Sequence, residues 1–149
     1  MRCFASSKGD PCAMGAWGYE IFDNDSACDW QEDLLASDDI VPIQTALLRV
    51  TEAEDFVDLD EASQALAACE ALAHLRGRPG LQEAPLDELS AWASQHKELP
   101  TGPLVPIAKL ALERIKTDEC ELKQLWQDSD EFDKWLATVE DVSRRVEST

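Results

Sequence analysis

The chain has 149 residues, and 44% of them are hydrophobic, which is enough for the core of one domain of ordinary size. Its 31 acidic and 13 basic residues give a formal net charge of −18. This charge argues against binding to nucleic acid, which needs lysine and arginine to displace counterions, and against binding to anionic membranes. It fits a soluble protein that repels its own copies, or one that meets a basic protein partner.

Residues 1–13 contain no apolar run of the kind found in a signal peptide. We expect them to form a disordered extension, or to be an over-extended start that precedes the true first residue, Met14. From residue 14 to 149 we expect a single all-α domain. No stretch of about eighteen consecutive apolar residues occurs, so the sequence predicts no membrane span.

The stretch MGAWGYEIFDNDSACDW, residues 14–30, places three aspartates close together in sequence. Asp23, Asp25 and Asp29 could bind Mg²⁺ or Ca²⁺, because hard cations prefer several oxygen ligands. A turn at Asp23 and a helix cap at Asp25 account for the same residues without a metal. We favour the turn and the cap, and keep the metal site as the alternative.

The same stretch carries four aromatic side chains, those of Trp17, Tyr19, Phe22 and Trp30. Large aromatic residues either seal a core or mark a binding surface, and Trp17 and Tyr19 precede the first expected helix. We expect these four to form a lid over the helices, or an interaction surface.

Apolar residues at helical spacing predict a succession of helices along the rest of the chain. The expected ranges are 25–35, 42–50, 58–76, 86–97, 105–117 and a last helix from residue 129 or 130 onward. Residues 118–126, capped by Asp118, should add only a turn or two. The sequence therefore predicts a helical bundle of about six helices, with an irregular N-terminal segment packed on it.

The clearest of these helices begins after Asp58, which is a good N-cap with Glu61 three residues later. Gly77 is a natural stop for it. Most of its apolar residues are alanines, and small side chains let neighbouring helices approach closely. We expect this helix to lie at the centre of the bundle.

The sequence contains no recognisable catalytic or cofactor motif. His74 follows Cys69 by five residues, a spacing that turns the two side chains well apart on a helix, and Cys69 itself should be a small buried apolar residue. His96 lies near a helix end, where the helix dipole favours its charge. The five cysteines are widely spaced, which argues against structural zinc and for reduced thiols in the cytoplasm. We expect no cofactor.

Several strings resemble one known family. MGAWG at 14–18, FDND at 22–25 and DW at 29–30 look like the start of the small bacterial domain-of-unknown-function family DUF4259. The strings EASQALAACEALAHLRGRP, LERI and LKQLWQDSDEFDKWLATVEDV also resemble its pattern, so the likeness covers residues 14–146. Glu20 departs from it, since a glycine is expected there. The resemblance implies a bacterial cytosolic protein and supplies no established activity, substrate or cofactor.

Two functional hypotheses follow from these features. The first is a non-enzymatic interaction factor, immunity-like or regulatory, that binds a basic protein through its acidic surface. The alternative is a divalent-metal-binding module or metal-dependent enzyme that uses Asp23, Asp25 and Asp29. The oligomeric state does not follow from the sequence.

Overall fold

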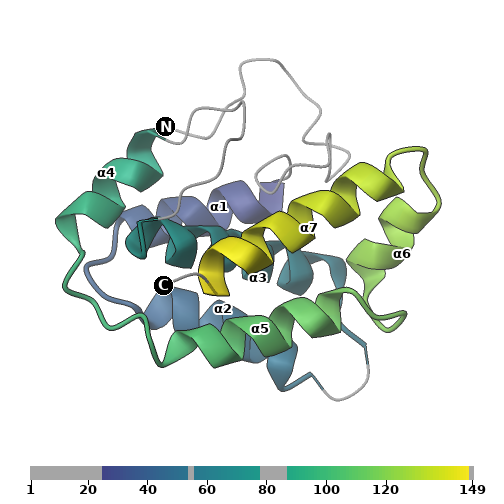
Figure 1. The fold of residues 1–149 in the computed structure, drawn as a ribbon, viewed down its shortest axis with the longest axis horizontal. Coiled ribbons are helices and arrows are strands. Elements are labelled where there is room, and N and C mark those ends of the chain that lie inside the picture. Colours follow the sequence, from purple (N-terminus) through teal and green to yellow (C-terminus); the bar gives the residue numbers. More distant parts are fainter. Residues whose placement is uncertain (1–24, 54–55, 78–86, 148–149) are drawn as a thin grey trace.

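The computed structural model describes residues 25–53, 56–77 and 87–147, and in these ranges the chain forms seven helices (Figure 1). They are α1 (Asp25–Leu35), α2 (Val41–Thr51), α3 (Leu59–Leu75), α4 (Asp87–Gln95), α5 (Leu104–Ile115), α6 (Glu121–Gln127) and α7 (Phe132–Glu147). The predicted all-α class is confirmed. The expected extension at 1–13 and the irregular segment before Asp25 lie outside the described residues.

The alanine-rich helix α3 lies at the centre of the bundle, as its composition predicts. It packs against each of the other six helices, and every residue from Ala65 to Leu75 is buried. Figure 1 shows α3 behind α7, with α2 and α5 along one side. Alanine side chains permit this because they let helix backbones approach from several directions at once, and Cys69 is buried among them.

The two ends of α3 follow the predicted signals. The Asp58 carboxylate accepts a hydrogen bond of 2.8 Å from the Glu61 backbone N–H, so Asp58 is the N-cap. Gly77, just after the helix, has a φ of +80°, a conformation that glycine adopts without steric cost. Local sequence alone therefore determines where this helix starts and stops.

The apolar faces of the surrounding helices also point inward as predicted. The buried residues include Ile43, Ala46, Leu47 and Val50 of α2, Ala108, Ala111, Leu112 and Ile115 of α5, and Trp135, Val139 and Val142 of α7. Together with α3 they form one continuous core. No helix in the described ranges is both long enough and apolar enough to cross a membrane.

The start of α6 differs from the prediction, and the cause is a contact with a distant part of the chain. Cys120, not Asp118, is the N-cap, and its backbone is extended. Val57 and Cys120 form a parallel β-bridge, in which the Val57 N–H donates to Glu119 O at 2.8 Å and its carbonyl accepts from the Glu121 N–H at 2.9 Å. Because the bridge holds the chain extended, the helix begins only at Glu121.

Candidate functional site

The predicted aspartate cluster is described only in part. Asp25 is the first residue of α1, and Asp29 lies one turn later with an exposed side chain. Asp23 lies outside the described residues. Within the ranges that the structure describes, no group of three or more histidine, cysteine, aspartate or glutamate residues could hold a metal ion. The three-aspartate site needs Asp23, so it stays a prediction.

The predicted aromatic lid is likewise described at one residue. Trp30 is 7% exposed and belongs to the core, and its indole N–H donates to the Pro42 carbonyl at 3.3 Å. It thereby ties α1 to the first turn of α2. Trp17, Tyr19 and Phe22 lie outside the described residues.

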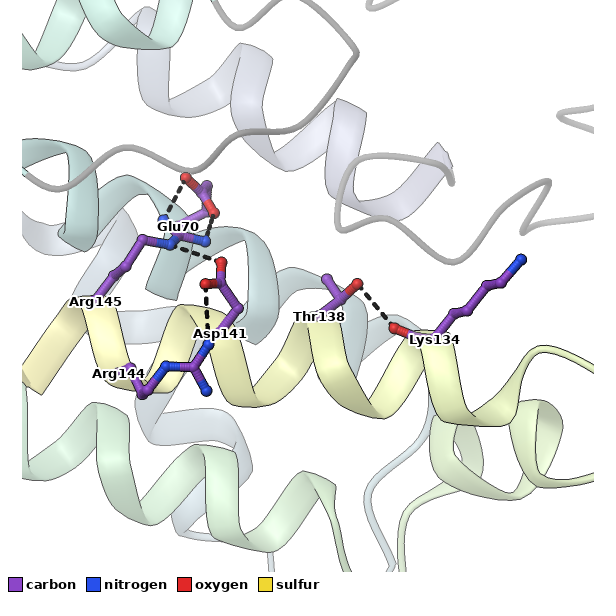
Figure 2. A network of polar contacts seen from close by, with 6 residues as sticks. All are labelled: Glu70, Lys134, Thr138, Asp141, Arg144 and Arg145. Carbon is purple, nitrogen blue, oxygen red and sulfur yellow. Dashed lines mark hydrogen bonds and ion pairs between the residues drawn. The ribbon is translucent and has the colours of Figure 1, made fainter.

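A buried ion pair joins the central helix to the last one. Glu70 of α3 is fully buried, and both of its carboxylate oxygens accept hydrogen bonds from the Arg145 guanidinium of α7, at 3.0 Å from Nη1 and 2.8 Å from Nη2 (Figure 2). His74 Nε2 lies 3.0 Å from Glu70 Oε2, one turn along α3. The paired geometry matches the planar fork of arginine, which gives strong and directional bonds.

The same arginine carries the network from the core to the surface. Its Nε donates to Asp141 Oδ2 at 2.8 Å, and Asp141 is four residues earlier on α7 with its side chain 46% exposed. Arg144 approaches the other oxygen of Asp141 at 3.4 Å. Figure 2 shows Arg145 reaching away from α7 toward Glu70, while Arg144 stays along its own helix.

Charge pairing, not burial, sets the ionisation of Glu70. Burial by itself would raise the pKa of the carboxyl, but the hydrogen bonds and charges of His74 and Arg145 outweigh it and hold the pKa below the usual 4.5. The guanidinium pKa of Arg145 is raised in turn, because its bonds to Glu70 and Asp141 outweigh its burial. The stabilisation from Glu70 is therefore complete above about pH 4.5 and is lost as the pH falls through the lowered pKa.

These shifts favour a structural role for the network over acid–base catalysis. A general acid or base needs a pKa near the working pH, and the pKa of Glu70 moves away from neutrality. The neighbouring Cys69 is fully buried, and burial raises the pKa of its thiol, so it is a poor nucleophile. The network instead holds α7 against α3 through the bonds between Arg145 and Glu70.

Sequence reasoning missed this network. Glu70 and Arg145 are 75 residues apart, and no local motif links them. One signal was present: Glu70 is a single acid inside the apolar run LAACEALA, where a buried carboxylate needs a cation. That signal indicates a partner but does not identify it.

A second cluster lies at the end of α4 and involves His96. The imidazole stacks on the Trp92 ring, with 4.4 Å between ring centroids, and the Trp92 indole N–H donates to Ser37 O at 2.8 Å. His96 Nδ1 lies 2.7 Å from Trp92 O, and Nε2 lies 3.3 Å from Asp38 Oδ1. Both oxygens are acceptors, so only the protonated ring can donate to both. The cluster joins α4 to the segment between α1 and α2.

Replacing Arg145 by methionine should lower the free energy of unfolding by about 3 kcal/mol or more, because it removes the guanidinium from a buried carboxylate. Urea denaturation followed by circular dichroism measures this loss. The control is Arg144→Met, at a side chain that is 72% exposed and paired with Asp141 at the surface. Such a pair contributes no more than about 1 kcal/mol. Equal losses in the two variants would contradict the role given to Arg145.

His96 should titrate above its ordinary pKa of 6.5, because the Trp92 carbonyl and the Asp38 carboxylate both favour the protonated ring. Its contribution to stability should be complete below pH 6.5 and disappear as the pH rises through the raised pKa. NMR titration of the imidazole measures the pKa directly.

Asp38→Asn should lower that pKa, and Asp39→Asn is the matched control. Asp39 accepts a hydrogen bond from the Val41 N–H rather than contacting His96. If the two variants moved the His96 titration equally, the contact with Asp38 would not be its cause.

With this geometry in place, comparison with known proteins adds one finding. The chain matches the family described as "Domain of unknown function (DUF4259)" over residues 15–138. Neither the curated proteins nor the solved structures include a match to the chain. The matched range takes in α1 to α6 and the first part of α7, and it contains Glu70 but ends before Arg145. The chain belongs to the DUF4259 family.

Proposed function

We propose that this protein is a non-enzymatic interaction factor that binds a basic protein partner, with a toxin-neutralising or regulatory role. The observation that carries the proposal is the exposure of the acidic side chains in a chain whose formal net charge is −18. Among the acids whose side-chain exposure the structure describes, Glu70 is the one that is buried, and Arg145 compensates it. The other acids in that set are partly or fully exposed, so their negative charge is available to a partner.

Exposed acids of this kind suit recognition better than catalysis. Complementary charge steers a basic partner toward the surface and accelerates association, and it discriminates against acidic competitors. The buried ionisable groups of α3 and α7 are engaged in holding the fold together, as their pKa shifts indicate. The exposed acids are thus available to a partner, while the buried ionisable groups stabilise the fold. This contrast supports an interaction role.

We infer that the protein acts in a bacterial cytoplasm. Cys69 and Cys120 are free and buried, which suits a reducing compartment. The family resemblance supports the bacterial source.

Immobilised protein should capture a basic protein from the cells of origin, and salt should release it. Raising the ionic strength from about 0.05 M to about 0.5 M shortens the Debye length and screens contacts between exposed charges. Mass spectrometry of the eluate identifies the captured protein, and calorimetry with the purified partner measures the salt dependence.

The control is a resin that carries an unrelated acidic protein of similar net charge, which accounts for simple ion exchange. Failure to capture any basic protein beyond this control, or an affinity that salt leaves unchanged, would refute the proposed function.

A divalent-metal module remains the second candidate, supported by the position of two aspartates on one helix. Asp25 and Asp29 are four residues apart in α1, which places them on the same side of the helix one turn apart. Asp23 would supply a third carboxylate from the preceding residues.

Titration of the protein with Mg²⁺, Mn²⁺ and Ca²⁺ tests this candidate by calorimetry and by thermal melting. A specific site should release or absorb heat and raise the melting temperature, and Asp29→Asn should weaken both effects. The control is Asp33→Asn, an exposed acid one turn further along α1. An absence of heat and of a melting shift would remove the metal hypothesis.

A further inference from the structure

The β-bridge between Val57 and Cys120 sets the direction of the side chains around it. Successive side chains in an extended segment point to opposite sides. Val57 and Cys120 are fully buried, so their neighbours Phe56 and Glu119 point outward, and Glu121, the first residue of α6, is exposed as well. Phe56 is consequently 46% exposed, although it is a large aromatic residue. The bridge therefore presents an aromatic ring among carboxylates at the surface.

Helix α6 extends this surface by one turn. Leu125 lies four residues after Glu121 and three before Asp128, so the three side chains share one face of the helical turn. Leu125 is 45% exposed, while Leu122, one turn earlier on the side of the helix that adjoins the core, is buried. Figure 1 places α6 at one end of the bundle. We call Phe56, Glu119, Glu121, Leu125 and Asp128 the Phe56–Leu125 face.

The acids of this face have few cationic partners in the part of the chain that the structure describes. Glu121 accepts a hydrogen bond of 2.9 Å from the Leu59 backbone N–H, which is a neutral donor. Glu119 lies 3.8 Å from Arg114, at the outer limit of an ion pair, and its side chain is 67% exposed. The apolar side chains are thus surrounded by negative charge that nearby cations offset only in part.

This combination identifies the chemistry of an occupant. An exposed phenylalanine binds the stem of lysine or the guanidinium of arginine over its ring, and adjacent carboxylates bind their charged ends. Leu125 requires an apolar side chain opposite it. A second copy of this chain suits the face poorly, because two copies that each carry −18 repel.

The geometry points to the Phe56–Leu125 face as the docking surface for a basic segment of a partner protein that carries lysine or arginine beside apolar side chains. This inference rests on the proposed function and adds the place of contact and the composition of the segment that binds there.

Two synthetic peptides of equal positive charge test the inference. One peptide carries leucines at helical spacing, three and four residues apart, with lysines between them. In the other peptide every leucine is replaced by serine. Fluorescence anisotropy should show the lysine–leucine peptide binding more tightly to the full chain. Phe56→Ser and Leu125→Ser should each weaken that binding by about fivefold or more, which is the loss expected for an apolar contact at the centre of an interface.

Leu110→Ser is the matched control. Leu110 lies on α5 and is 62% exposed, and it is not one of the five residues of the proposed face, so its replacement should leave peptide binding unchanged. Circular dichroism and thermal melting check that each variant is folded. If Phe56→Ser is unstable, Leu125→Ser decides the question, since it truncates one exposed side chain of α6.

The outcomes separate this inference from the proposed function. Salt-sensitive binding of both peptides with equal affinity, or binding that neither serine variant weakens, would overturn the docking surface and leave the basic partner in place. If neither peptide bound, the proposed function itself would fail. Self-association without peptide that Leu125→Ser abolishes would make a second copy the occupant and overturn the inference.

Discussion

The bond between Glu70 and Arg145 is the contact on which the arrangement of the bundle depends. A carboxylate at the centre of the most buried helix carries a desolvation cost of several kcal/mol unless a cation reaches it. Arg145 supplies that cation from α7, with two hydrogen bonds of 3.0 and 2.8 Å. The apolar stripe of α7 sets which side of the helix faces the core, and these two directional bonds add a polar contact to α3 near the end of that helix. The ion pair thus fixes the position of Arg145, and with it the last turns of α7, against Glu70.

The predictable parts of this fold are those that nearby residues determine. The spacing of Ile43, Leu47 and Val50 identifies the buried face of α2, and Asp58 and Gly77 mark the ends of α3. Each of these signals acts within one or two helical turns, so the sequence displays it directly.

The parts that escaped prediction depend on residues far apart in the chain. Aspartate is a favoured N-cap residue, so Asp118 is expected to start the helix. The bridge between Val57 and Cys120 instead keeps the backbone extended beyond Asp118. Glu70 reads as one acid in an alanine-rich helix, and nothing local indicates that Arg145, 75 residues later, will reach it. In both places a tertiary contact overrides or completes a local preference. One sequence, with no related sequences beside it, carries no pairing information of this kind.

The long-range contacts also connect the fold to the proposed function. Inside the bundle, the network of Glu70, Arg145 and Asp141 neutralises the charge that burial would penalise. At the end of the bundle, the bridge turns Val57 inward and leaves Phe56 exposed beside carboxylates. The hydrophobicity of the phenylalanine ring favours its burial. Its exposure therefore follows from how the two distant segments meet at the bridge. The contact that delays the start of α6 therefore also creates the aromatic and acidic surface on which a basic partner could be recognised.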